Sequence, residues 1–154
     1  NKTYTEIYGF TKLTEDEMTE FAERFLPLLN PKLIKMITNE NGELLAFIIA
    51  MADLSEAIKN SRGRILPFGW ARILWAMKTS KRLQLLLGAI HPNYQNKGLD
   101  AVLATMLFGS ALKLGFKTVD SHLIMKDNLK MRGEIEKLEG FKLYKEYCIF
   151  RKKL

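Results

Sequence analysis

A short polar loop carries the residues of this chain that are best suited to chemistry. The loop spans residues 91–98 and follows the apolar run Leu83–Ile90, which is typical of a buried strand. After the loop, apolar residues recur at helical spacing, at Leu99, Val102, Leu103, Met106, Leu107, Ala111 and Leu114. A helix start presents unpaired amides and the positive end of the helix dipole. Because Gly98 lets the backbone approach a ligand and Lys97 adds a charge, the loop predicts a phosphate or pyrophosphate site.

The composition is that of one globular domain with a basic surface. The 154 residues include 24 Lys and Arg against 17 Asp and Glu, a net charge of +7. We expect one domain spanning residues 1–154, long enough to bury a core. The charge suits an anionic partner such as a nucleotide cofactor, nucleic acid or membrane surface, or it is simply a solvated basic surface. We expect no nucleic-acid partner, because no basic stripe is interleaved with aromatic residues.

The remaining composition argues against metal and membrane-spanning chemistry. Two histidines and one cysteine do not form a metal cluster, so we expect no metal. Cys148 lies in a strand-like run and is interpreted as a buried, inert thiol. No apolar run is long enough to span a membrane and no signal peptide is recognisable, so a cytoplasmic location is expected. The chain begins with Asn1, which is compatible with a piece of a longer protein.

The pattern of the whole chain predicts strands that alternate with helices. A capping box at Thr14–Glu17 indicates a helix start, and Asn41-Gly42 favours a tight hairpin in which both residues take positive φ. The expected strands are Tyr8–Leu13, Lys32–Thr38, Glu43–Met51, Leu83–Ile90, Thr118–Met125 and one or two within Lys142–Phe150. The expected helices follow Thr14, Gly98 and Asn128 (to Leu138), with a helical insert at about residues 53–80. This order predicts an α/β (α+β) fold, a mixed sheet with helices on both faces.

The element order and the loop resemble the GNAT superfamily of acyl-CoA-dependent N-acetyltransferases. Members carry a Gln/Arg-x-x-Gly-x-Gly/Ala signature, which stands here as Gln95-Asn96-Lys97-Gly98-Leu99-Asp100 after the lead-in Ile90–Tyr94. Asn128 and the later Gly140-Phe141 pair extend the likeness. Asp100 departs from the pattern, because its carboxylate would repel a pyrophosphate unless it points away. With the Pro-Phe-Gly-Trp insert at 67–70, the chain is similar to GNAT-like domains that form the C-terminal half of larger bacterial proteins.

The resemblance implies a mostly antiparallel sheet, acetyl-CoA as acyl donor, and a small-molecule or peptide amine as acceptor. It places the pyrophosphate on the amides of Asn96–Ala101 and the pantetheine arm along Ala89–His91, with Asn128 near that arm and Lys97 near the phosphates. The coenzyme-binding residues that it implies are Ala89, Ile90, His91, Gln95, Asn96, Lys97, Gly98, Leu99, Asp100, Ala101 and Asn128.

No residue can be assigned to proton transfer. Many members use a glutamate on the strand before the loop, but Leu83–Ile90 contains no carboxylate and has Gln84 as its only polar side chain. The tyrosine that many members place before the Gly-Phe pair is also missing. Other candidates, each with a structural alternative, are His91, His122, Tyr144, Tyr147, Asp53 and Glu56, whereas Glu134, Glu136 and Glu139 resemble an exposed helix face. The alternative to an N-acyltransferase is a GNAT-fold binding or scaffold module that has lost its chemistry.

The segment Phe68–Met77 is too apolar for an ordinary surface helix, and cations flank it. Four interpretations remain open: a wall of the acceptor site, a dock for a partner domain or a second copy, an interfacial membrane helix, or packing on the sheet.

Overall fold

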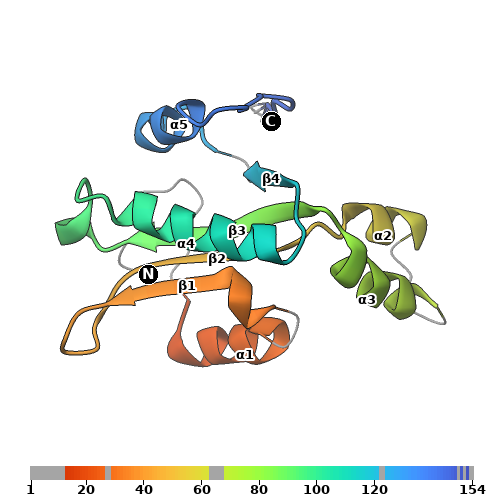
Figure 1. Cartoon of the computed structure of the whole chain (residues 1–154). Coiled ribbons are helices and arrows are strands. Elements are labelled where there is room, and N and C mark those ends of the chain that lie inside the picture. Colours follow the sequence, from red (N-terminus) through yellow and green to blue (C-terminus); the bar gives the residue numbers. More distant parts are fainter. Residues whose placement is uncertain are drawn as a thin grey trace. The chain divides into compact units, whose positions relative to one another are not determined.

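The computed structural model describes residues 13–26, 29–62, 68–121, 124–148, 150 and 152, and only the backbone of residues 130 and 134. The chain divides into two compact units, Asn1–His122 and Leu123–Leu154 (Figure 1). Most of the strand expected at Tyr8–Leu13 lies outside the described residues, and Leu13 itself is not in a strand.

A four-stranded mixed sheet forms the centre of the first unit. It contains β1 (Ile34–Thr38), β2 (Leu44–Ala52), β3 (Arg82–Ile90) and β4 (Thr118–Ser121), in that spatial order. β1 pairs with β2 and β2 with β3 antiparallel, whereas β3 pairs with β4 parallel. This confirms the predicted mixed α/β fold with a mostly antiparallel sheet. The last strand is shorter than expected: His122 and Leu123 lie outside the described residues, and Met125 is not in a strand.

The hairpin between β1 and β2 forms where it was predicted, but with a different turn. Gly42 has φ of 79°, whereas Asn41 does not take a positive φ. The Gly42 amide donates to the Asn39 carbonyl at 3.0 Å, and the Asn39 amide donates to the Glu43 carbonyl at 3.0 Å. A turn followed by one left-handed glycine is the longer hairpin connection, which needs only one such residue.

Two capped elements precede the sheet. Helix α1 (Glu15–Phe25) has the predicted capping box, because Thr14 Oγ1 accepts from the Glu17 amide and Glu17 accepts from the Thr14 amide. The 3-10 helix η2 (Pro31–Leu33), capped by the side chain of Asn30, takes the first residues of the strand expected from Lys32. Proline at the first helical position explains this, since its fixed φ suits a helix start and it cannot donate to a strand ladder.

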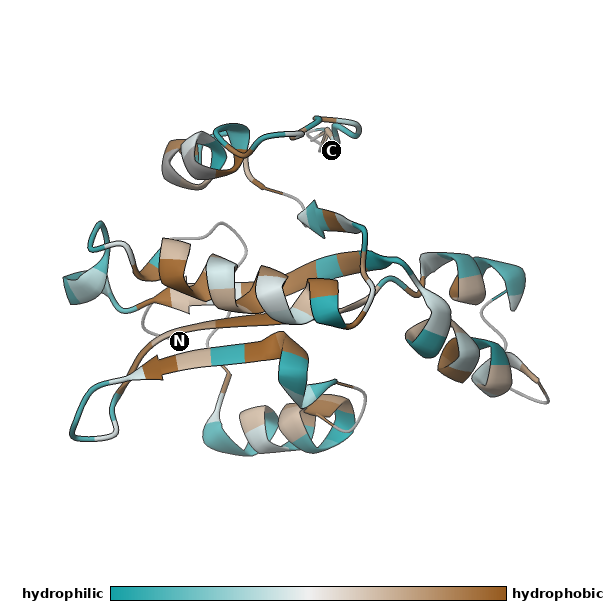
Figure 2. Cartoon of the chain, in the orientation of Figure 1, coloured by the Kyte–Doolittle hydropathy of each residue, from teal (hydrophilic) through white to brown (hydrophobic). Residues whose placement is uncertain are grey.

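Helix α4 (Leu99–Lys113) packs against β1, β2 and β3 and builds the core of the first unit. Figure 2 shows hydrophobic colouring concentrated on β2, β3 and α4. The buried cluster consists of Leu33, Ala50, Ala52, Leu83, Leu107, Ala111 and Phe116. The buried face of α4 is narrower than the predicted stripe, because Val102 and Met106 are each 48% exposed. Residues four apart stack on one face, so Leu103, Leu107 and Ala111 face the sheet and the next column faces outward.

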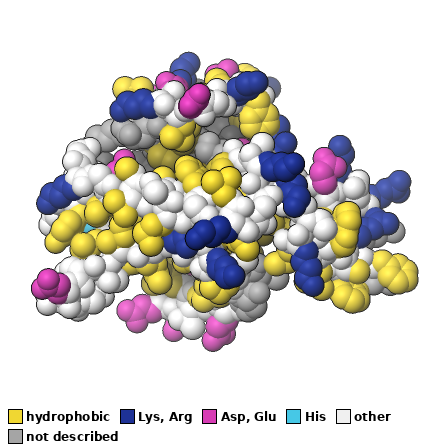
Figure 3. Space-filling model, in the orientation of Figure 1, with side chains coloured by type: hydrophobic (Ala, Val, Ile, Leu, Met, Phe, Trp, Pro, Cys, Tyr) yellow, Lys and Arg dark blue, Asp and Glu magenta, His cyan; other side chains and the backbone are white. Residues whose placement is uncertain are grey.

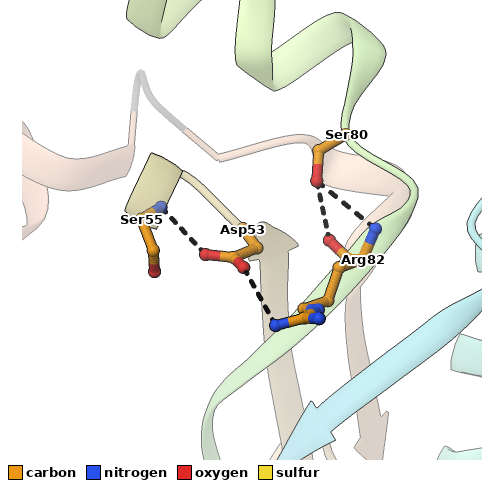
Figure 4. A network of polar contacts seen from close by, with 4 residues as sticks. All are labelled: Asp53, Ser55, Ser80 and Arg82. Carbon is orange, nitrogen blue, oxygen red and sulfur yellow. Dashed lines mark hydrogen bonds and ion pairs between the residues drawn. The ribbon is translucent and has the colours of Figure 1, made fainter. Parts of the chain in front are cut away.

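The predicted helical insert is present as α2 (Ser55–Asn60) and α3 (Gly69–Thr79), which contact each other. Asp53 joins the insert to the sheet (Figure 4). Its Oδ1 accepts from the Ser55 amide at 2.9 Å, its Oδ2 lies 3.8 Å from Arg82 Nη1, and its amide donates to the Arg82 carbonyl at 2.9 Å. The Asp53 carboxylate therefore caps α2 and holds it at the start of β3.

The second unit contains α5 (Leu129–Glu136), which is capped by Asn128 and carries an Arg132–Glu136 ion pair of 2.9 Å. The prediction of strands in Lys142–Phe150 is wrong for residues 142–148 and 150, none of which is in a strand. A strand needs a neighbouring strand to receive its backbone hydrogen bonds, and the described part of this unit offers none. The interpretation of Cys148 as buried is also wrong, because its thiol is free and exposed.

Candidate functional site

The loop between β3 and α4 folds in two parts. The first is the 3-10 helix η3 (Pro92–Tyr94), in which the chain satisfies its own donors. The amide of Asn93 donates to His91 Nδ1 at 3.3 Å, and the amide of Tyr94 donates to the His91 carbonyl at 2.8 Å. The amide of Gln95 donates to the Pro92 carbonyl at 3.3 Å. A proline at the start of a 3-10 turn accounts for this local order.

The second part of the loop, Asn96–Ala101, has backbone amides that donate no hydrogen bond to the described protein. Within the described chain, none of the six successive amides of Asn96–Ala101 donates a hydrogen bond to a protein acceptor. The first amide of α4 that donates across the helix start belongs to Val102, whose partner is the Gly98 carbonyl at 3.2 Å. No side chain caps α4. The loop therefore presents a row of unpaired donors at the positive end of a helix dipole.

Two left-handed residues shape this row. Asn96 has φ of 59° and Gly98 has φ of 78°, whereas Lys97 between them does not take a positive φ. Left-handed residues among successive unpaired amides are typical of concave anion-binding nests, and the row Asn96–Ala101 is called the nest below. The sequence signalled Gly98 but not the backbone of Asn96, although asparagine is enriched in the left-handed region. A Cβ added at Gly98 would meet no heavy atom within 4 Å, so the space in front of the nest is open.

Opposite charges flank the nest. Lys97 Nζ lies 4.8 Å from the centroid of the Tyr94 ring, and the Tyr94 ring lies edge-on to His91 at 5.9 Å. Asp100 is exposed in the first turn of α4, where the helix dipole favours a carboxylate. A hollow of about 290 Å³ continues along the same helix, lined by Ala101, Val102, Thr105 and Met106.

The end of β3 next to the loop is a strand edge. Pairing with β4 runs from Arg82 to Leu85, whereas pairing with β2 continues to Ile90. Among the described residues, no strand pairs with Ala89 and Ile90 on the side away from β2. The register between β2 and β3 shifts between Ile49 and Ala50, which places Leu86 in a bulge. A bulge bends a strand and increases its twist, so β3 changes direction at Leu86, before it reaches the loop.

Backbone alternation decides which group faces that edge. The His91 amide donates to the Leu45 carbonyl of β2 at 2.7 Å, and its carbonyl accepts from Tyr94. Because consecutive residues of a strand point their backbone groups to opposite sides, Ile90 presents its amide and carbonyl to the edge away from β2. Both main-chain groups of His91 are thus engaged within the protein.

The side chains considered for proton transfer are mostly occupied. A neutral imidazole has one acceptor nitrogen, and Nδ1 of His91 already accepts from Asn93. The Asp53 side chain is only 13% exposed and is engaged with Ser55 and Arg82. Glu56 is exposed on α2, and Gln84 lies on β3 in register with Asp120 of β4. His122 lies outside the described residues.

The remaining candidates belong to the second unit. Asn128 Oδ1 accepts from the Met131 amide at 3.2 Å, so its amide nitrogen is the part left to donate. Tyr144 and Tyr147 are exposed, which corrects the expectation that they pack, and Lys145 lies over the Tyr144 ring at 5.2 Å. Glu136 and Glu139 are exposed, as expected.

Two kinds of feature are absent from the described residues. They contain no group of three or more His, Cys, Asp or Glu side chains arranged to hold a metal ion. They also contain no helix that is both long and apolar enough to cross a membrane.

Curated relatives match this chain over its whole length but at low identity. The chain is 25% identical over 160 residues to a bacterial ceramide synthase of Caulobacter vibrioides and 27% identical over 161 residues to the protein YghO of Escherichia coli. It spans 41% and 40% of the length of these two relatives. No family model matches the sequence.

Solved structures of acetyltransferases share the fold. An aminoglycoside 6'-N-acetyltransferase, AAC(6')-Iy in complex with a bisubstrate analogue of coenzyme A, aligns with a TM-score of 0.59 at 14% identity, over 98% of this chain and 86% of its own. The related AAC(6')-IG of Acinetobacter haemolyticus aligns with a TM-score of 0.56 at 14% identity, over 94% and 85%. A GNAT-like decarboxylase, GphF in complex with isobutyryl-CoA, aligns with a TM-score of 0.50 at 14% identity, over 86% and 62%. The mixed sheet, its order of elements and these likenesses together show that this chain has the GNAT acetyltransferase fold.

Proposed function

We propose that this domain binds an acyl-CoA through the nest at Asn96–Ala101 and transfers its acyl group to an amine. The observation that supports it most directly is the row of six amides that have no protein acceptor. A diphosphate offers several acceptor oxygens and a negative charge, which suits a concave row of amides at a helix start. Lys97 leaves the Tyr94 ring to contact the phosphates, because an ion pair in the nest is stronger than its present cation–π contact.

The pantetheine arm lies along the open edge of β3 in this proposal. Its amides pair with the amide and carbonyl of Ile90, in the manner of a strand added to a sheet edge. This placement is supported by the described pairing with β4, which ends at Leu85 and leaves Ile90 without a described strand neighbour on that side. Ala89 and Ile90 therefore carry the arm, and His91 contributes by fixing the turn that follows.

Transfer requires little beyond positioning. The amine nitrogen attacks the thioester carbonyl, a C–N bond forms, and the C–S bond breaks to release the thiol of coenzyme A. The proton lost by the amine balances the proton taken up by the leaving thiolate. Since β3 carries no carboxylate and His91 Nδ1 is engaged, a water molecule accepts the amine proton, and catalysis rests mainly on orienting amine and thioester.

Acetyl is the proposed acyl group, and a small-molecule or peptide amine is the proposed acceptor. The names of similar proteins suggest the acceptors to test: an aminoglycoside amine for the solved neighbour AAC(6')-IG, and, for the relative named a ceramide synthase, an amine that becomes part of a ceramide. These differ so much in polarity that a panel with both separates a polar from a lipid acceptor.

The test is calorimetric titration of the chain with acetyl-CoA. We expect saturable binding that weakens about tenfold or more in Gly98→Leu, because the side chain fills the nest. Gly42→Leu is the matched control: Gly42 also has positive φ and open space around its Cβ, but lies in the β1–β2 hairpin. Equal affinity in both variants and in the unmodified chain would overturn the assignment of the nest.

The second candidate function is a binding or scaffold module without turnover. It is favoured by the absence of a carboxylate on β3 and by the engaged nitrogen of His91. Release of free thiol from acetyl-CoA in the presence of each amine separates the two. Amine-dependent release supports the transferase, whereas tight binding without release across the panel supports the module.

A further inference from the structure

Helix α3 exposes its most apolar side. Phe68 just before the helix is 73% exposed, and Trp70, Leu74 and Trp75 are 51%, 49% and 68% exposed. The opposite side of α3, with Gly69 buried and Ile73, Ala76 and Met77 half-buried, is the one that packs within the unit. Residues four apart share a helix face, so Trp70 and Leu74 form one column and Trp75 lies beside them.

Cations surround this apolar side. Lys78 continues the column of Trp70 and Leu74 by one turn. The exposed cations of α2, α3 and the residues next to them are Lys59, Arg62, Arg72, Lys78 and Lys81, and the acids among these residues are Glu56 and the largely buried Asp53. Arg72 Nη1 donates to the Asn60 carbonyl at 2.9 Å and so ties α2 to α3. Figure 3 shows basic and hydrophobic side chains gathered over these two helices.

We infer that the exposed side of α3, formed by Phe68, Trp70, Leu74, Trp75 and Lys78, docks onto an anionic lipid bilayer surface. Tryptophan rings and aliphatic side chains enter the boundary between headgroups and acyl chains, while cations beside them bind lipid phosphates. A helix of 11 residues is too short to span a bilayer but can lie in its plane.

The positive charge around the exposed side of α3 favours an anionic bilayer over a second protein as its partner. The core of a protein–protein contact is depleted in charge, whereas the apolar column of Trp70 and Leu74 ends in the charged side chain of Lys78. On a bilayer the same lysine extends its ammonium group to the headgroups while its methylene stem stays with the apolar side chains. The net positive charge of α2 and α3 is complementary to an anionic leaflet. This inference does not rest on the proposed acyl transfer.

Tryptophan fluorescence can report this contact directly. It contains two tryptophans, and both lie on α3. Vesicles of phosphatidylcholine and phosphatidylglycerol in equal parts should shift tryptophan emission to shorter wavelength and co-sediment the protein. Vesicles of phosphatidylcholine alone should do so weakly, and added salt should reverse the binding. Bromine on the lipid acyl chains should quench the emission, because the rings reach below the headgroups.

Variants test whether α3 is the contact. Phe68→Ser combined with Leu74→Ser keeps both tryptophans and should lower vesicle partitioning about tenfold or more, since it removes two apolar anchors. Lys78→Gln should weaken binding to anionic vesicles alone. Leu112→Ser, at a side chain that is 71% exposed on α4, is the matched control and should leave partitioning unchanged. Circular dichroism confirms that each variant is folded.

Three results would overturn the inference: partitioning that the serine variants do not lower, equal binding to neutral and anionic vesicles, or an emission shift that follows protein concentration without vesicles. The last result would assign the surface to a second copy of the chain. Gly98→Leu should lose coenzyme binding and keep vesicle binding, so a failure of the proposed function and a failure of this inference give different results.

Discussion

Helices α4 and α3 differ in which of their groups the described protein leaves exposed. Helix α4 buries Leu103, Leu107 and Ala111 against the sheet but leaves the amides at its start without acceptors. Helix α3 packs through its smaller residues and leaves Trp70 and Trp75 exposed. Under the two proposals above, an anion binds at the start of the first helix and an anionic lipid surface covers the exposed side of the second. The difference teaches that a helix can be anchored firmly by one part and still present a binding surface with another.

The largest expected effect tests the anchored part of α4. Leu107 is 0% exposed, so Leu107→Ala should lower the free energy of unfolding by about 2–5 kcal/mol through lost burial and a cavity. Leu74→Ala on α3 should change it by only about 0.5 kcal/mol, because that side chain is half exposed. Urea denaturation followed by circular dichroism measures both. Similar losses would mean that α3 packs as tightly as α4.

The next largest effect tests whether a coenzyme binds at the amides that begin α4. A ligand that binds only the folded state stabilises it, so acetyl-CoA at about one hundred times its Kd should raise the free energy of unfolding by about 2.7 kcal/mol. The same addition to Gly98→Leu should give little gain. Thermal unfolding with and without coenzyme measures this. A gain that survives in Gly98→Leu would place the coenzyme elsewhere.

A smaller effect concerns the attachment of α3. Asp53→Ala removes the cap on the Ser55 amide, which is worth about 1 kcal/mol, and an ion pair with the half-exposed Arg82 that adds little. Amide hydrogen exchange should become faster in α2 and α3 while α4 remains protected. Uniform loss of protection in both regions would show that the insert is no separate unit of stability.

The smallest expected effect is at Asp100 in the first turn of α4, where one substitution should lower stability and raise coenzyme affinity. Asp100→Asn should cost about 0.3–1 kcal/mol of stability, because an exposed carboxylate there complements the helix dipole. It should also tighten acetyl-CoA binding, since a negative charge next to the pyrophosphate is removed. Calorimetry and urea denaturation measure the two changes. Unchanged affinity would indicate that Asp100 points away from the bound phosphates.

The sequence predicted those parts of the fold that depend on short-range patterns. The capping box at Thr14, the hairpin at Gly42 and the helix that begins after Gly98 each depend on a few adjacent residues, and the structure has all three in place. Which side of α4 faces the sheet could not be predicted as well, because apolar residues cover much of the helix and tertiary packing selects among them.

Long-range pairing could not be predicted from the pattern. Residues 142–148 include Tyr144 and Tyr147, a residue type that favours strands, but a strand exists only where a neighbour accepts its hydrogen bonds. The bulge at Leu86 also has no local signal, since it arises from the register of β3 against β2. The roles of Ile90 and His91 in the site follow from that register and not from their residue types.

The extra residue at Leu86 means that β3 uses one residue more than β2 over the same stretch of paired backbone. Leu85 is paired with Ala50 and Leu87 with Ile49, so deleting Leu86 would leave every other pair of the two strands in place. The deletion would straighten β3 and reduce its twist, while Ala89 and Ile90 kept their neighbours on β2. Leu86 is therefore the position at which this strand can lose a residue and keep its pairing.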